Sequence, residues 1–138
     1  MSFKDFLLYL IFVILVIFTL SRSAYSQEPI PAKQAIRAIV GEASGEGWCG
    51  MYLIACGIRN RKTLSGVNGL KAPHVDNQPE WVWLLAKNAW EFSKDNSIHT
   101  GDHWGSKVCD KKWIKRMESK GFVKAYDYKG HIFYEGAK

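Results

Sequence analysis

The stretch AIVGEASGEGWCGMYLIACGIRNR, residues 38–61, places a glycine-rich bend between two apolar segments that have helical periodicity. On the N-terminal side of the bend, the apolar positions fall on one stripe, which predicts a helix over residues 31–43. On the C-terminal side, the same periodicity and several small residues predict a closely packed helix over residues 48–62. The bend itself carries two acidic residues, Glu42 and Glu46.

The rest of the chain completes a mainly helical pattern. A turn-rich stretch follows the second helix, and Asn77 with Glu80 resembles a capping box that opens a third helix through about Ser93. Asp110 is a suitable cap for a fourth helix, which Gly121 would end. The last segment, FVKAYDYKGHIFYE, has two β-prone runs around a turn and predicts a hairpin. We therefore expect one α+β domain, predominantly α, with four or so helices and a small C-terminal β-hairpin.

Residues 1–26 have the layout of a secretory signal, with a weakly basic start, an apolar run from Phe6 to Leu20 and small residues near Ser26. The run is shorter than the roughly 18 to 20 residues of a permanent membrane span. We expect cleavage after Ser26 and an exported domain of residues 27–138. The alternative is a retained signal anchor, which Asp5 and the strong hydrophobicity of the run favour and which would hold the domain at a membrane.

The domain predicted for residues 27–138 is basic. Removing Lys4, Asp5 and Arg22 from the 19 basic and 13 acidic residues of the whole chain leaves a net charge of +5. Such a charge suits an anionic partner, for example a cell-wall polymer or lipid headgroups. Because no helix-turn-helix, zinc-finger or RNA-binding aromatic pattern accompanies it, we expect no nucleic-acid partner. The length suits one domain, expected to be a monomer.

Three cysteines, Cys49, Cys56 and Cys109, allow at most one intramolecular disulfide in an oxidising compartment. On one helix, Cys49 and Cys56 would lie about 10 Å apart, too far to bridge. A disulfide would therefore include Cys109, with Cys49 as the better partner, and three free thiols are the alternative. The four histidines lack the paired spacing of zinc sites, so no metal and no cofactor are expected.

Glu42 is the first candidate for chemistry. It falls in the last turn of the first predicted helix, where the exposed carbonyl dipoles disfavour an ionised carboxylate. Apolar neighbours such as Val40 and Trp48 would favour the protonated form by desolvation. A protonated carboxyl near neutral pH is what a general acid requires. Glu46 lies among glycines and is expected to be more solvated. From the residues alone, two solvated surface acids are the alternative, because an acid near a helix end is common.

The order of the motifs resembles the SleB-type cell wall hydrolases. Their opening pattern is an acidic residue, Ala, any residue, Gly, Glu, a short gap, Gly, an aliphatic helix and then Asn-Arg. Near the end of the chain, TGDHWGS, KKWIKRM and YKGHIFYE resemble the family's closing segments. The matching positions are Glu42, Ala43, Gly45, Glu46, Gly50, Asn60 and Arg61, and then Gly130, His131, Phe133 and Tyr134. The resemblance spans about residues 35–135.

This resemblance implies a lysozyme-like fold that cleaves peptidoglycan strands between N-acetylmuramic acid and N-acetylglucosamine. Family members that degrade the spore cortex act as lytic transglycosylases, in which the first Glu of the motif is the single acid and base. Carried over, Glu42 would be the catalytic residue and Glu46 a supporting one. The alternatives are a hydrolytic muramidase, which usually needs a second carboxylate, and a non-catalytic wall-binding or envelope assembly module.

The remaining matched positions have expected roles in the groove, with structural roles as alternatives. Trp104 would stack on a sugar ring, whereas Asn60 and Arg61 would fix the end of a helix. One segment, KTLSGVNGLKAPHVDNQPEW, is shorter than its family counterpart, which helps to form one wall of the sugar groove. The residues expected to bind substrate or to brace the Glu42 loop are Asp102, His103, Trp104, His131 and Tyr134.

Overall fold

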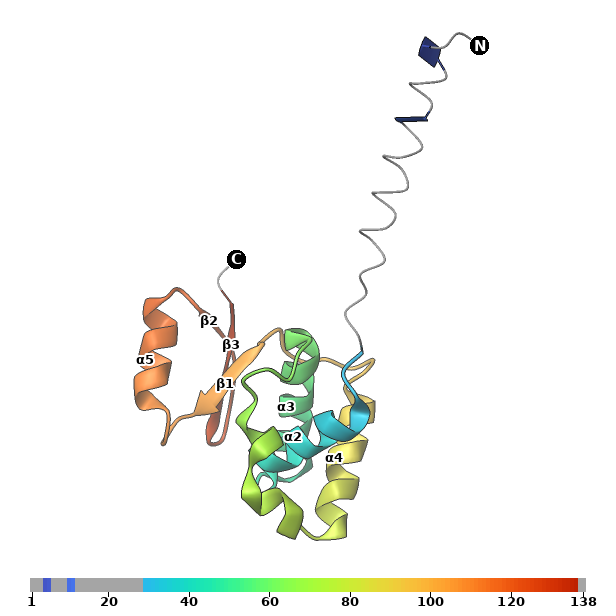
Figure 1. The fold of residues 1–138 in the computed structure, drawn as a ribbon. Helices are drawn as coiled ribbons and strands as arrows, with labels where there is room; N and C mark the ends of the chain where they lie inside the picture. The colour runs from blue at the N-terminus through green and yellow to red at the C-terminus, as the bar shows by residue number, and fades with distance from the viewer. Residues whose placement is uncertain (1–3, 6–9, 12–28, 137–138) are drawn as a thin grey trace.

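Helices and a small sheet make up residues 29–136 of the computed structural model, which also describes residues 4–5 and 10–11 (Figure 1). The predicted signal, residues 1–26, otherwise lies outside the described residues. No helix among the described residues is both long enough and apolar enough to cross a membrane. The elements are α2 (Ala32–Ala43), α3 (Gly47–Arg61), the 3-10 helices η1 (Asn68–Lys71) and η2 (Pro73–Asn77), α4 (Glu80–Phe92), β1 (His103–Ser106), α5 (Lys111–Ser119), β2 (Val123–Tyr128) and β3 (His131–Glu135).

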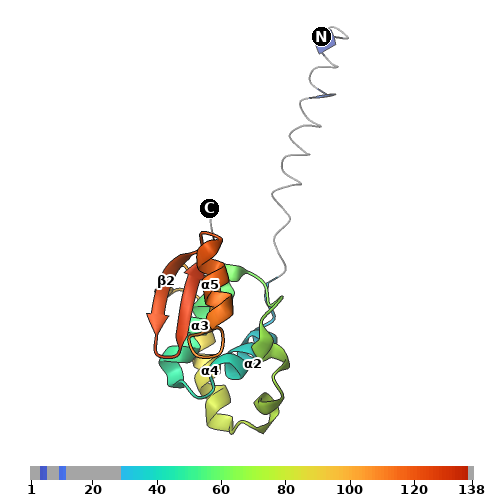
Figure 2. The same cartoon turned by 90° about the vertical axis from the view of Figure 1, so that its left-hand side faces the viewer.

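The predicted α+β architecture, mainly helical, is confirmed, and so is the hairpin of β2 and β3. The sequence did not predict β1, which pairs antiparallel with β3 and makes a sheet in the order β1-β3-β2. Helices α2, α3 and α4 pack on one side of this sheet, and α5 packs on the other (Figures 1 and 2). Successive side chains of a strand point to opposite faces. Phe133 accordingly joins the core of the three helices, whereas Ile132 and Tyr134 join a second core with Met117 of α5.

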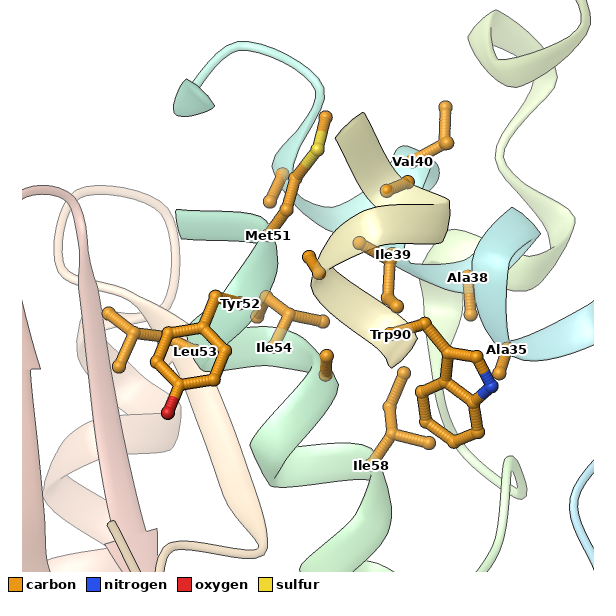
Figure 3. Close-up of a cluster of buried hydrophobic side chains, with 14 of the residues drawn as sticks. Ala35, Ala38, Ile39, Val40, Met51, Tyr52, Leu53, Ile54, Ile58 and Trp90 are labelled. Atoms are coloured by element: carbon orange, nitrogen blue, oxygen red, sulfur yellow. The ribbon is translucent and has the colours of Figure 1, made fainter. Parts of the chain in front are cut away.

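Helix α3 forms the centre of the larger core. Every residue from Gly50 to Ile58 is buried, which is the pattern of a helix covered on all sides. Figure 3 shows Ile54 and Ile58 of α3 in the same buried cluster as Ile39 of α2 and Trp90 of α4. Burying each of these large side chains contributes about 1.5 to 3 kcal/mol. The rigid α3 therefore supports the elements on both of its sides.

The predicted caps are only partly correct. The capping box is wrong, because Asn77 ends η2 and α4 begins after Pro79 without a side-chain cap. Asp110 does occupy the N-cap position of α5, but its carboxylate accepts the backbone N–H of Ser106 at 2.7 Å instead of a helix N–H. Gly121 follows α5 with a φ of +81°, as expected for a glycine that ends a helix.

The predicted disulfide between Cys49 and Cys109 is not formed. All three cysteines are free in the structure, with Cys49 and Cys109 exposed and Cys56 buried in the core. Cys49 lies in the first turn of α3, whereas Cys109 comes just before Asp110, the N-cap of α5. The structure has three free thiols, which is the alternative given in the sequence analysis.

A close backbone approach joins α2 to η1. A Cβ atom added to Gly41 would lie 2.0 Å from the carbonyl oxygen of Gly69, and a Cβ atom added to Gly69 would lie 2.4 Å from the carbonyl oxygen of Ala38. Real Cβ atoms do not approach backbone this closely, so both positions require glycine. This contact holds the loop segment against the last turns of α2.

We predict that Gly41→Ala destabilises the domain by about 1 to 3 kcal/mol, because the methyl group must push η1 away from α2. The free energy of unfolding, measured by urea titration, checks this. Gly45→Ala is the matched control, because a Cβ atom there meets nothing within 4 Å, and it should change the free energy by less than about 0.5 kcal/mol. Equal effects of the two substitutions would contradict the close approach.

Candidate active site

A cleft of about 150 Å³ opens where the end of α2, the segment before η1, β1 and the start of β3 meet. The short segment that differs from the family pattern contributes one wall, as its family counterpart was expected to do. Glu42 reaches the cleft from the last turn of α2. The lining residues are Glu42, Arg61, Gly66, Val67, Asn68, Trp104, Gly105, Ser106, Asp110 and His131.

Two N–H groups hold the carboxylate of Glu42. The backbone N–H of Gly69 donates to Oε1 at 2.7 Å, and the indole N–H of Trp104 donates to Oε2 at 3.2 Å. Trp104 is itself fixed, because its ring lies against Gly57 of α3, where an added Cβ atom would come within 2.9 Å of the ring. The carboxylate therefore has a defined position that depends on three separate parts of the chain.

The two oxygens of Glu42 are not equivalent. Oε1 accepts a short hydrogen bond from a backbone group that cannot move away, whereas the bond to Oε2 is at the long end of the normal range. Oε2 is therefore the less tightly held of the two oxygens. The sequence analysis expected Val40 and Trp48 beside Glu42, but both make other contacts. Val40 lies in the core, and Trp48 stacks on Tyr52 with ring centroids 5.1 Å apart.

Glu46 reaches the cleft through His131. Its Oε1 lies 2.8 Å from Nδ1 of His131, and the two side chains are 21% and 14% exposed. The contact is an ion pair whenever the imidazole is protonated. Nδ1 is buried at this contact, and the His131 side chain lines the cleft. Gly50 makes room for this arrangement, because a Cβ atom there would lie 2.5 Å from Cβ of Glu46.

Three of the expected groove residues do not line this cleft. Tyr134 is 1% exposed in the core beneath α5, and its hydroxyl donates to Glu118 at 2.9 Å. Burial, with a smaller effect of Glu118, raises the pKa of Tyr134 to about 12. Asp102 lies 2.8 Å from Nδ1 of His103, whose ring packs edge-on against Phe122. Tyr134, Asp102 and His103 therefore contact other protein residues on the α5 side of the sheet, which fits a structural role for each of them.

Asn60 and Arg61 have different environments. Asn60 donates to the carbonyl oxygens of His99 and Gly101 at 2.9 and 3.0 Å, and it thereby ties the end of α3 to the segment before β1. Arg61 was expected to be structural, but its side chain lines the cleft together with Glu42. Its guanidinium passes over Gly66, where an added Cβ atom would lie 2.9 Å away. Arg61 therefore brings a cation into the candidate site.

His99 is a positioning residue that the sequence analysis missed. It is 7% exposed, its Nε2 lies 2.9 Å from the carbonyl oxygen of Leu53, and its Nδ1 accepts the N–H of Gly101 at 3.0 Å. Burial lowers the pKa of this imidazole, against a smaller opposite effect of the Leu53 carbonyl. The neutral ring therefore fastens the segment before β1, which carries Trp104, to α3. A lone histidine between Ile98 and Thr100, in a stretch with no periodicity, gave no sequence signal for this role.

No cluster of three His, Cys, Asp or Glu residues that could hold a metal ion occurs in the part of the chain that the structure describes. The chain matches no protein family, no curated protein and no solved structure in comparisons of its sequence and fold. The geometry of the cleft and the motifs of the sequence are therefore the observations on which a function can be argued.

We predict that the domain is less stable at pH 5.5 than at pH 7.5. Because the folded pKa of His99 is lowered, the unfolded chain takes up the proton first as the pH falls below the ordinary value of about 6.5. The stabilisation is complete above that value and is lost as the pH falls toward the folded pKa. Urea titrations at the two pH values measure the effect.

The exposed His74 supplies the control for this prediction. His74→Gln should keep the loss of stability at pH 5.5, whereas His99→Gln should reduce it while lowering stability at pH 7.5. A free energy of unfolding that is the same at both pH values in the unsubstituted protein would show that His99 is not held in its neutral form.

Proposed function

We propose that this chain cleaves the glycan strands of peptidoglycan between N-acetylmuramic acid and N-acetylglucosamine, as a lytic transglycosylase with Glu42 as acid and base. The observation that carries the proposal is the Glu42 carboxylate, held by two N–H donors at the wall of a cleft. The resemblance of the motifs to the SleB-type hydrolases adds the substrate class. The predicted export signal would deliver the domain to the envelope, where this substrate lies.

In the first step, protonated Glu42 donates its proton from Oε2 to the glycosidic oxygen. The bond between C1 of the muramyl residue and that oxygen breaks, and positive charge develops at C1 and the ring oxygen. Glu42 becomes a carboxylate as the bond breaks. The N–H groups of Gly69 and Trp104 stabilise this charge without rearrangement, because they already point at the two oxygens.

In the second step, the Glu42 carboxylate takes the proton from the C6 hydroxyl of the same muramyl residue. The C6 oxygen attacks C1 and closes a 1,6-anhydro ring, so the carboxyl returns to its starting form and no water is consumed. A single carboxyl group is sufficient, because the substrate supplies its own nucleophile. This differs from hydrolysis, in which a second carboxylate usually activates water or attacks C1.

Other residues of the cleft have supporting roles in this proposal. Trp104 acts as a positioning residue, since its N–H group is engaged by Glu42 and its ring by Gly57. Arg61 can donate hydrogen bonds to hydroxyl or N-acetyl oxygens of the sugar. His131, which contacts Glu46, lines the same cleft.

Replacing the acid tests the proposal. Glu42→Gln keeps the shape of the side chain but cannot donate the proton, and we expect the rate of muropeptide release to fall by at least about 100-fold. Glu80→Gln, at an exposed position of α4, is the matched control and should keep full activity. Mass spectrometry of the products should find muramyl ends lighter by one water than hydrolytic ends. Release that is absent in the unsubstituted protein, or equal in Glu42→Gln, would favour a non-catalytic wall-binding module.

A hydrolytic muramidase is the second candidate, because a second carboxylate, Asp110, lines the same cleft as Glu42. In the structure, Asp110 is engaged by the Ser106 N–H, a bond that an asparagine oxygen can also accept. For the transglycosylase, we therefore expect Asp110→Asn to change the rate by less than about threefold and to leave the anhydro ends unchanged. Reducing ends together with a loss of at least about 100-fold would identify Asp110 as the second acid of a hydrolase.

A further inference from the structure

The positive charge of the domain is concentrated on one helix. Residues 111–120, KKWIKRMESK, contain five basic residues and one acidic residue, a net charge of +4, whereas the whole of residues 27–138 carries +5. The basic residues are Lys111, Lys112, Lys115, Arg116 and Lys120, all of them exposed. The remainder of the domain is therefore close to neutral, and the charge marks a specific surface.

This surface has few internal partners. The one acidic residue of the segment, Glu118, accepts the hydroxyl of Tyr134, and Asp110 just before it accepts the N–H of Ser106. None of the ion pairs found among the described residues involves any of the five cations. Like charges placed close together repel one another, so the arrangement is costly for the free protein and suits an anionic ligand.

A hollow accompanies the charge. A cleft of about 640 Å³ lies at the start of α5, and its walls include Lys111, Lys112 and Arg116. Trp113 also lines it, and its ring is fixed against Gly105 of β1, where an added Cβ atom would lie 2.8 Å away. We call this hollow the basic cleft. A hollow of this volume has room for part of a short chain, whereas a flat lipid surface would need no hollow.

The basic cleft adjoins the candidate active site. Asp110 lines both of them, and it lies in the turn that joins β1 to α5. A strand that places a muramyl residue beside Glu42 must direct the peptide stem of that residue, or of a neighbouring one, away from the sugar. Peptide stems are short chains with free carboxylates, which are suitable partners for Lys and Arg.

We propose that the basic cleft binds the carboxylates of the peptide stems on the strand that is cut. This inference rests on the proposed function for the identity of the polymer. It assigns to α5 a preference for glycan that carries charged stems over bare or neutralised glycan. Since the cations are exposed, the attraction is electrostatic and weakens as salt increases.

The test measures binding separately from cleavage. Three forms of fluorescently labelled soluble strands are prepared: with intact stems, with stem carboxylates amidated, and with stems removed. Each form is mixed with Glu42→Gln protein. We expect intact strands to bind about tenfold more tightly than the other two forms at low salt, by fluorescence anisotropy. At 1 M salt the Debye length is only about 3 Å, and the three affinities should converge.

Charge reversal localises the effect. In the Glu42→Gln background, adding K112E and R116E should remove the preference for intact stems and leave binding of stripped strands unchanged. The matched control adds K33E and K94E, which make the same change in net charge at exposed positions of α2 and of the turn after α4. In this control, the ratio of the affinity for intact strands to the affinity for amidated strands should stay at half of its original value or more. Thermal unfolding of each protein verifies that it is folded.

Several results would overturn the inference. These are no binding to any strand, equal binding of intact and amidated strands, a preference that survives K112E with R116E, or an equal loss in the K33E and K94E control. Binding to anionic lipid vesicles that depends on Lys112 and Arg116, without a stem preference, would assign the basic cleft to a membrane instead. The two proposals can fail separately. If the Glu42→Gln protein prefers intact stems but the unsubstituted protein cuts no strand, the proposed function is refuted and this inference stands.

Discussion

The hydrogen bond from the backbone N–H of Gly69 to Glu42 is the contact on which the site depends. It exists only because Gly41 and Gly69 let η1 lie directly against the last turns of α2. A backbone donor has no side-chain rotamers, so the donor side of this bond loses no side-chain entropy when the bond forms. The glycines therefore serve the position of one carboxyl group as much as the packing of the loop.

The second support of Glu42 links the sheet to the helices. Trp104 projects from β1, packs on Gly57 of the buried α3 and reaches Oε2 with its indole N–H. The position of β1 depends in turn on Asn60 and His99, which fasten the preceding segment to α3. The large core thus acts on the site through α3, which cannot shift without disturbing residues buried on all of its sides.

The sequence predicted the elements better than the contacts. Periodicity located α2 and α3 to within about one residue, since core burial dictates the spacing of apolar side chains. Strand β1 was missed, because its four residues HWGS owe their conformation to pairing with distant β3 and have no periodic signal of their own. The motif made Glu42 a candidate, but no local pattern could indicate that a glycine 27 residues away would be its hydrogen-bond donor.

Alternation along β3 explains how one short strand serves two surfaces. His131 starts the strand at the wall of the Glu42 cleft, Phe133 enters the large core, and Ile132 and Tyr134 point to α5. The same strand therefore anchors the helix that carries most of the positive charge and the imidazole that faces the cleft. Because α5 and the cleft share this one rigid support, a ligand held by the cations of α5 would meet Glu42 at a constant distance and orientation. A polymer with regularly spaced branches is the kind of ligand for which such constancy matters.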